Sequence, residues 1–416
     1  MSMLSRRACI VVFLVFAISY FVSTLIRAIT ATLSPALTQE FALNASDLGL
    51  LAGGYFLGFA MTQLPLGSWL DRYGPRRVIL CFLVVAVLGC LAFAGATSFS
   101  GLLWARMLCG VGLSACLMAP LTGYRRWFPM TMQVRANSWM LMTGSMGLVA
   151  STLPVQWLLP VVGWRVLFVG LALLVVLAML MVIWVVPAWE SAPAAADERH
   201  DARDNTYREI WQSPYFRKMA PVGFVNYGGL LAIQTLWAAP WMMQVSGYSA
   251  EQAATGLFWI NVSMLGAFWT WGLISPWLAR KGLGVERMIC YGLPLGFIFL
   301  ALEVVFGQSY PAVSPVLLAL FCLSCTTLAL AQSAVGLAFP AALAGRALSA
   351  YNLVIFVGVF CMQWGIGLLI DGFVVLGWPK SQAFQGALTV FLAIGLASYL
   401  NFVARTGQER RAKTYA

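Results

Sequence analysis

The sequence has little charge and almost no histidine. Charged residues make up 9% of its 416 residues, and its single histidine is His200. A soluble globular chain is about a quarter charged, so this composition excludes an ordinary soluble protein. With one histidine, neither histidine catalysis nor a histidine metal site has the residues it needs. The sequence also offers no nucleophile–base pair and no cofactor-binding loop, so we predict no enzyme, cofactor or metal.

The nine cysteines do not suggest a ligand set either, since all lie in or beside apolar stretches. Cys322-Leu-Ser-Cys325 has the spacing of a metal or redox pair. Both residues fall on one predicted helix, however, with no other Cys or His pair nearby. We interpret them as small apolar packing residues.

Apolar residues dominate the composition of the chain. At 61% hydrophobic, the chain has more apolar residues than it can hide from water, so lipid must be its solvent. Runs long enough to cross a bilayer are predicted at about 11–33, 46–68, 78–99, 101–124, 136–159, 165–188, 219–245, 253–276, 287–307, 311–337, 347–371 and 382–404. With both termini cytoplasmic, all but four of the 25 Lys and Arg residues lie on the cytoplasmic side, as the positive-inside rule requires. The four are Arg27, Arg106, Arg165 and Lys380. The net charge of +11 follows from this bias and does not indicate nucleic-acid binding.

A short basic turn joins the second and third runs. It reads Gly67-Ser-Trp-Leu-Asp71-Arg72-Tyr-Gly74-Pro75-Arg76-Arg77, and Gly74-Pro75 is a turn signal. The string resembles the Gly-x-Leu-x-Asp-Arg-x-Gly-x-Arg-Arg signature of the major facilitator superfamily of secondary transporters. Trp69 departs from the small or aliphatic residue usual at its position. The resemblance implies that the turn gates the conformational cycle through Gly67, Asp71, Arg72, Gly74, Arg76 and Arg77.

A second string, Leu102 to Gly112, contains Arg106, Gly110 and Gly112. It resembles the superfamily's Arg-x-x-x-Gly-x-Gly signature. Glycines at this spacing let helix backbones approach closely, and the resemblance implies a role for Arg106 in proton coupling. The alternative is that Arg106 extends to the membrane interface without such a role, and the sequence leaves both open.

In the first run, Tyr20, Ser23 and Arg27 share one helix face. An arginine within a span costs about 2.5–3.5 kcal/mol on insertion scales, so it normally faces a water-filled cavity or a partner. The alternative is that Arg27 extends to the outer interface. The string from Leu25 to Leu37 resembles helix 1 of the organophosphate:phosphate antiporters and of the anion:cation symporters of the superfamily. In those groups the arginine pairs with the substrate's phosphate or carboxylate, which implies an anion-binding role for Arg27.

Later runs carry polar and aromatic residues at helical spacing. Gln234, Trp237 and Trp241 share a face, and Pro240 marks a place where the helix would bend. Such amides and aromatic residues either satisfy one another between helices or line a substrate cavity. The predicted substrate-binding residues are Tyr20, Arg27, Tyr55, Gln234, Trp237, Trp241, Asn352 and Gln363.

The composition changes at residues 190–218, where Pro, Ala and charges of both signs replace the apolar pattern. We predict a cytoplasmic linker there, between bundles formed by residues 1–189 and 219–416. Trp277-Leu-Ala-Arg280-Lys-Gly282 repeats the pattern Trp69-Leu-Asp71-Arg72-Tyr-Gly74, as duplication of a six-helix unit would produce. The expected fold is an all-α membrane protein of 12 transmembrane helices in two pseudosymmetric six-helix bundles, with the site between them.

By resemblance, the expected function is secondary transport of a small organic anion of the carboxylate type by alternating access. No second arginine occurs in 219–245, which disfavours a dianionic phosphate. The alternative is proton-coupled efflux of amphipathic drugs or other xenobiotics. The 17 tryptophans favour it, whereas Ser151-Thr-Leu-Pro154 does not continue the Gly-Pro-rich signature of the drug antiporters. A transporter-like receptor is a third alternative, although the chain carries no appended soluble domain to relay a signal.

The expected partners are a small-molecule substrate, a co-transported proton or other ion, and membrane lipid, with no nucleic acid. We expect a monomer in the bacterial inner (cytoplasmic) membrane.

Overall fold

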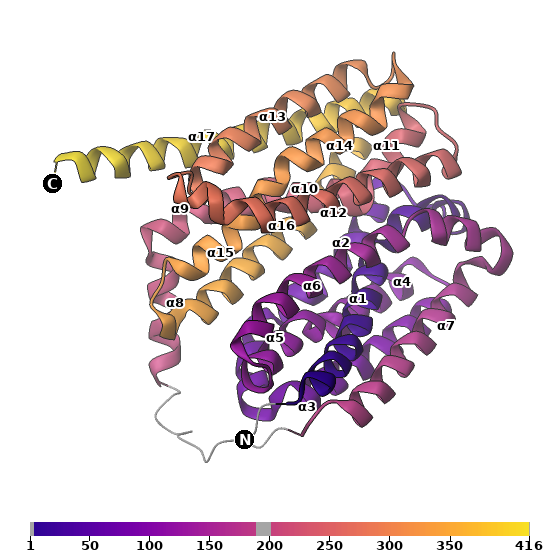
Figure 1. Cartoon of the computed structure of the whole chain (residues 1–416). Helices are drawn as coiled ribbons and strands as arrows, with labels where there is room; N and C mark the ends of the chain where they lie inside the picture. Colours follow the sequence, from indigo (N-terminus) through magenta and orange to yellow (C-terminus); the bar gives the residue numbers. More distant parts are fainter. Residues whose placement is uncertain (1–3, 189–200, 416) are drawn as a thin grey trace. The chain divides into compact units, whose positions relative to one another are not determined.

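The computed structural model of the chain describes residues 4–188 and 201–415. The first part of the predicted linker, with His200, lies outside the described residues. In these two ranges the regular elements are helices (Figure 1). Eight helical stretches are long and apolar enough to cross a membrane: Arg6–Phe41, Gln63–Ala94, Phe99–Trp127, Leu153–Val185, Val285–Phe306, Pro311–Leu337, Leu343–Val375 and Lys380–Gly407. A helical protein with membrane-spanning helices is thus confirmed, while the number 12 stays a prediction.

The chain divides into two compact units. The first unit comprises the described residues of 1–42 and 54–194, and the second those of 43–53 and 195–416. By sequence, Leu43–Gly53 would belong to the first bundle, but by its contacts it groups with the second unit. The predicted bundle boundaries at the 190–218 linker stay a prediction.

The first unit is built around α1. Its helices are α1 (Arg6–Phe41), the Gly54–Met61 part of α2 (Ala45–Met61), α3 (Gln63–Ala94), α4 (Phe99–Leu113), α5 (Ala115–Trp127), α6 (Met130–Ala150) and α7 (Leu153–Val185). The α1 helix begins after Ser5, whose hydroxyl accepts the amide of Ala8, as an N-cap residue does. It packs against α6 and α7, while α3 packs against α4, α5 and α7.

Two glycines interrupt long helices of the first unit. Gly74 in α3 has φ 78° and ψ 160°, and Gly163 in α7 has φ 74° and ψ 161°. Backbone at such positive φ is readily adopted by glycine alone, and Pro75, which follows Gly74, suits the first position of a new helix. The turn predicted over 67–77 is therefore shorter than expected, because one glycine is enough to interrupt the helix.

Other boundaries differ from the hydropathy prediction. The run 46–68 is divided at Thr62, between α2 and α3, and the run 136–159 is divided between α6 and α7. At the second break Thr152 has φ −102° and ψ −113°, with Pro154 following in the first turn of α7. Hydropathy misses such breaks because the side chains stay apolar on both sides of them.

The second unit contains the remaining helices: α8 (Asp201–Gln212), α9 (Pro214–Val222), α10 (Gly228–Ala232), α11 (Ala238–Gln244), α12 (Ala250–Arg280), α13 (Val285–Phe306), α14 (Ser314–Cys325), α15 (Leu330–Leu337), α16 (Ala341–Val375) and α17 (Lys380–Tyr415). The α16 helix packs against α10, α15 and α17, and α13 packs against α14 and α17. The run 219–245 is distorted by π-helical turns at Gly223–Tyr227 and Ile233–Trp237. The distortion therefore precedes Pro240, which lies three residues after the second π-helical turn.

The segment Leu43–Gly53 is held to α16 by a helix cap. The carboxylate of Asp371 accepts the backbone amides of Ala45 at 3.0 Å and Ser46 at 2.7 Å. A carboxylate there satisfies free amides at the N-terminus of α2 and complements the helix dipole. A Cβ atom built on Gly49 would lie 2.3 Å from the carbonyl oxygen of Gln363, so glycine is required for this close backbone approach.

Candidate functional site

Arg27 lies on α1 in the first unit and is only partly exposed. Its guanidinium carbon is 5.4 Å from the ring centre of Phe59, a cation–π distance. The Tyr20 hydroxyl lies within hydrogen-bonding reach of the guanidinium, and Tyr55 is also close enough to interact with its charge. The structure thus brings together Tyr20, Arg27 and Tyr55, which were predicted as site residues.

The direction of the Arg27 side chain bears on the two alternatives for it. Tyr20 precedes Arg27 by seven residues, or two helical turns towards the N-terminal end of α1. A guanidinium that reaches Tyr20 therefore points away from the C-terminal end of the helix, where the outer interface is expected. Tyr20 and Tyr55 are buried, with 7% and 0% of their surfaces exposed. This geometry argues against extension to the outer interface, and the binding role of Arg27 stays a prediction.

Arg106 is fully buried on α4. Its Nη1 donates to the carbonyl oxygen of Ile26 at 2.9 Å, and its Nη2 donates to that of Arg27 at 3.3 Å. Its guanidinium carbon is 5.2 Å from the ring centre of Tyr55. This burial and these bonds argue against extension of Arg106 to the membrane interface. Arg106 fixes the backbone that carries Arg27, and its predicted part in proton coupling stays a prediction.

The glycines after Arg106 allow two helices to touch by their backbones. A Cβ atom built on Gly110 would lie 1.9 Å from the carbonyl oxygen of Tyr55. One built on Gly58 would lie 2.2 Å from the carbonyl oxygen of Met107. The close approach expected for the Gly110 signature is present, and it places Tyr55 beside Arg106.

The predicted residues of the second unit are buried and bonded to one another or to nearby helices. Gln234 donates to Asn261 at 2.7 Å, and Trp237 donates to the carbonyl oxygen of Gln363 at 3.1 Å. The amide of Gln363 donates to Thr235 at 3.0 Å. These bonds correspond to the alternative in which polar groups satisfy one another between helices.

Asn352 follows the same pattern, because it accepts from Gln332 at 2.6 Å. Trp241 donates from its indole N–H to the carboxylate of Glu303. Asn261, Thr235, Gln332 and Glu303 were not predicted as neighbours of the site. Their signal in the sequence was only that each is a polar residue in an apolar run.

The basic signature lies at the surface of the first unit. Asp71, Arg72 and Arg77 are exposed, and a Cβ atom on Gly67 would meet no atom within 4 Å. Arg76 donates from Nη2 to the carbonyl oxygen of Ile183 and so joins α3 to the end of α7. The gating role of the signature residues stays a prediction.

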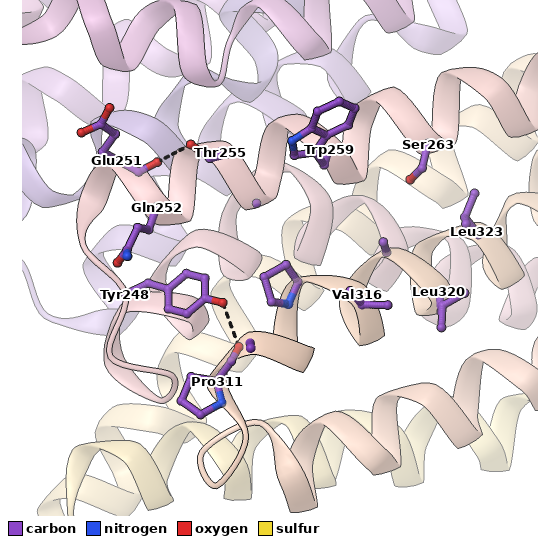
Figure 2. Close-up of a pocket in the computed structure, with 14 residues that line it drawn as sticks. Tyr248, Glu251, Gln252, Thr255, Trp259, Ser263, Pro311, Val316, Leu320 and Leu323 are labelled. Carbon is purple, nitrogen blue, oxygen red and sulfur yellow. Dashed lines mark hydrogen bonds between the residues drawn. The ribbon is translucent and has the colours of Figure 1, made fainter.

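A groove of about 1050 Å³ lies between α12 and α14 in the second unit. Figure 2 shows Glu251, Gln252, Thr255, Trp259 and Ser263 following one another along α12, opposite Val316, Leu320 and Leu323. The Tyr248 hydroxyl donates to the carbonyl oxygen of Pro311 at 2.9 Å near one end. The predicted substrate-binding residues are not among its lining residues.

Comparison with known sequences is informative over most of the chain. The family model described as Major Facilitator Superfamily matches residues 16–362. The probable L-galactonate transporter of Escherichia coli is 22% identical over 381 residues, which is 88% of this chain and 82% of that protein. The 4-hydroxybenzoate transporter PcaK of Pseudomonas putida is 24% identical over 69% of this chain and 70% of its own length. PcaK of Acinetobacter baylyi is 27% identical, but the match spans 44% of this chain and only 40% of that relative.

Two solved structures share the fold. A bacterial homologue of the human lysosomal transporter Spinster, inward-facing and unoccupied, has a TM-score of 0.77 at 16% identity, covering 96% of this chain and 97% of that one. A D-xylose-proton symporter has a TM-score of 0.76 at 15% identity, covering 95% and 97%. At this level of identity the likeness concerns the fold alone.

Proposed function

The chain belongs to the major facilitator superfamily of membrane transporters, and we propose that it moves a small organic anion of the carboxylate type by alternating access. The names of two relatives support this class, because 4-hydroxybenzoate and L-galactonate are both carboxylates. The family consists of transporters and not enzymes, so the expected ligand is a substrate that leaves chemically unchanged.

The observation that carries the proposal is the position of Arg27 among Tyr20, Tyr55 and Phe59. A guanidinium can hold a carboxylate by two parallel hydrogen bonds, and the three rings offer apolar surface to the remainder of an organic acid. The phenol group of Tyr20 can donate a further hydrogen bond, and that of Tyr55 can do so by exchanging its 3.4 Å bond to the carbonyl oxygen of Ser23. Arg106, the second cation here, donates to the backbone oxygens of Ile26 and Arg27. The combination of the Arg27 guanidinium and aromatic surface therefore suits a small organic anion better than a cationic drug.

Residues of the second unit are proposed to contribute as well. Gln234, Trp237, Trp241, Asn352 and Gln363 would exchange some of their present hydrogen bonds for bonds to substrate. Such an exchange costs little when the new partner replaces the old one, whereas an unreplaced buried bond costs about 1–3 kcal/mol. Ligand binding is therefore expected to rearrange polar bonds within this unit.

A panel of ligands tests the substrate class. Thermal shifts of the purified protein are measured with 4-hydroxybenzoate, L-galactonate, a sugar phosphate and a cationic dye. The proposal expects stabilisation by at least one carboxylate and none by the dye, since ligand binding to the native state raises its stability. Stabilisation by the dye alone would favour the drug-efflux alternative.

We further propose 12 transmembrane helices in two six-helix bundles, residues 1–189 and 219–416, joined by a cytoplasmic linker at 190–218. The protein is proposed to be a monomer in the bacterial inner membrane, in contact with lipid. The Lys/Arg distribution is the physical basis for this orientation.

Orientation can be measured directly. A reporter that is active only outside the cytoplasm is expected to give no signal when it is fused to the C-terminus, because the basic loops retain that end inside. The same reporter inserted after Thr97, in the loop between α3 and α4, is the control and is expected to be active. A signal from the C-terminal fusion and none from the Thr97 insertion would reverse the proposed topology.

Asp71→Asn is expected to slow transport several-fold while the substrate affinity stays within a few-fold. The reason is that Asp71 is exposed in the basic signature and its charge acts there on the conformational cycle. Tyr73→Phe is the matched control, since it changes an exposed neighbour without changing charge, and it should transport normally. Loss of binding in folded Asp71→Asn protein would exclude a pure gating role.

A further inference from the structure

Glu303 is a fully buried carboxylate in α13, a helix long and apolar enough to span the membrane. Its Oε1 accepts two hydrogen bonds, from the indole N–H of Trp241 and from the hydroxyl of Ser314. Its Oε2 is buried and has no hydrogen-bond partner in the described part of the chain. Both donors are neutral, so neither supplies a counter-charge.

Charged groups on the surrounding helices lie elsewhere. Within the described side chains, the titratable or charged residues of α11, α13, α14 and α17 are Glu286, Arg287, Cys290, Tyr291, Cys322, Cys325, Lys380, Tyr399 and Arg405. Arg287 precedes Glu303 by 16 residues, or about 24 Å along a helix. On α17 it is the neutral Gln385 that meets this turn of α13, donating to the carbonyl oxygen of Val304 at 3.2 Å. Lys380 is exposed at the start of that helix, and the ion pairs found among the described residues do not include Glu303.

This arrangement suits a carboxyl group that gains and loses a proton. An ionised carboxylate buried in a membrane without a cation is costly. A proton on Oε2 removes the charge and leaves Oε1 free to accept from Trp241 and Ser314 as before. The proton comes from hydronium, which becomes water, and returns to water when the group ionises.

We propose that Glu303 is the proton-binding site through which this protein couples substrate movement to a proton gradient, as a proton–anion symporter. The inference rests on the proposed anion transport and adds the coupling ion and its carrier. A proton bound at Glu303 would compensate the single negative charge of a carboxylate held at Arg27.

Glu303 lies close to one end of α13, from which a proton would enter. The helix ends at Phe306, and the amide of Gly307 donates to the carbonyl oxygen of Glu303 at 2.8 Å. Three residues separate Glu303 from the end of the helix, or about 5 Å. The connection that follows is exposed at Gln308 and Tyr310, so a proton has one helical turn to cross.

The protonation state of Glu303 can act on the helix that carries the predicted site residues. Trp241 is one turn beyond Trp237, and the π-helical turn Ile233–Trp237 directly precedes α11. Such π-helical turns occur often at functional sites, and their backbone groups can change hydrogen-bond partners. A hydrogen bond to an ionised carboxylate is about twice as strong as one to a neutral group. Protonation therefore loosens Trp241 and, through it, the segment that bears Gln234 and Trp237.

The test uses the full-length protein in liposomes, with radiolabelled 4-hydroxybenzoate as the probe. Counterflow without a pH gradient requires binding and alternating access but no net proton movement. Accumulation driven by a pH gradient requires coupling, and one pH unit can sustain about tenfold accumulation per proton. Glu303→Gln should keep counterflow within about threefold of the wild type and lose accumulation. Glu251→Gln, which removes an exposed carboxylate of α12, is the matched control and should behave as the wild type does.

Two results would overturn the proposal. One is accumulation by Glu303→Gln equal to the wild type. The other is loss of counterflow as well as accumulation in a variant of unchanged thermal stability, which would make Glu303 a residue of the cycle and not a proton carrier.

A different result would show that the anion proposal itself is wrong. In that case the wild type itself shows neither counterflow nor accumulation of the probe. Infrared difference spectra between acidic and alkaline pH then test Glu303 without any substrate. The pH range is kept above that in which exposed carboxyls titrate. The C=O stretching band of a protonated carboxyl should then be present in the wild type and in Glu251→Gln and missing in Glu303→Gln. An unchanged band in Glu303→Gln would exclude this residue as the proton site.

Discussion

Arg27→Gln is expected to weaken binding of the transported carboxylate at least about a hundredfold, since each hydrogen bond to a charged group contributes about 1.5–3 kcal/mol and two are lost. Folding should survive the change. Arg106 bonds to the backbone carbonyl oxygen of residue 27, which the substitution leaves in place. Affinity is measured by calorimetry with 4-hydroxybenzoate, alongside thermal stability and monodispersity.

Arg27→Lys separates charge from shape. Lysine keeps the positive charge but loses the planar pair of donors, so its affinity should fall between that of the wild type and that of Arg27→Gln. Arg165→Gln is the matched control, because Arg165 forms a partly exposed ion pair with Glu40 at 2.6 Å. Exposed pairs contribute about 0–1 kcal/mol, so this variant should bind normally. Normal transport by Arg27→Gln would remove Arg27 from the site and the anion assignment with it.

The family and the helical fold could be predicted because two signals in the sequence are strong. Long apolar runs indicate helices that span a lipid bilayer. The Gly67–Arg77 string matches the superfamily signature at six residues and lies between two such runs. The helix breaks at Thr62 and Thr152 could not be predicted, because apolar side chains continue on both sides of each break. Leu43–Gly53 groups with the second unit through contacts with α16, such as those of Asp371 and Gln363, which are more than 300 residues away along the chain.

The partners of buried polar groups were harder to predict for a related reason. The sequence left two roles open for Arg106, and only the fold shows that it bonds to the backbone of α1 at Ile26 and Arg27. In the same way, only the fold shows that Glu303 is buried against Trp241 and Ser314. A polar residue in an apolar run needs a hydrogen-bond partner when it is buried. Its position in the sequence does not show which helix supplies that partner.

Gly110→Ala is expected to give the largest loss of stability among the variants considered. The added methyl group would lie 1.9 Å from the carbonyl oxygen of Tyr55, 2.8 Å from its carbonyl carbon and 3.0 Å from the amide nitrogen of Phe59. All three are backbone atoms, so no side chain can rotate away and the helices must separate. Overpacking of this kind costs about 1–3 kcal/mol or more, which corresponds to a fall in melting temperature of about 2–10 °C in a large domain.

Gly170→Ala in α7 is the matched control, because a Cβ atom there meets nothing within 4 Å. Alanine exceeds glycine in helix propensity by about 1 kcal/mol, so this variant should melt at the same temperature as the wild type or higher. The two substitutions add the same methyl group, and they differ only in what it meets. Separation of α2 from α4 would also move Tyr55 and Phe59 away from Arg106 and Arg27, so Gly110→Ala should weaken ligand binding as well as lower stability. Equal melting temperatures and affinities for the two variants would contradict the backbone contact on which the arrangement of Tyr55, Arg106 and Arg27 depends.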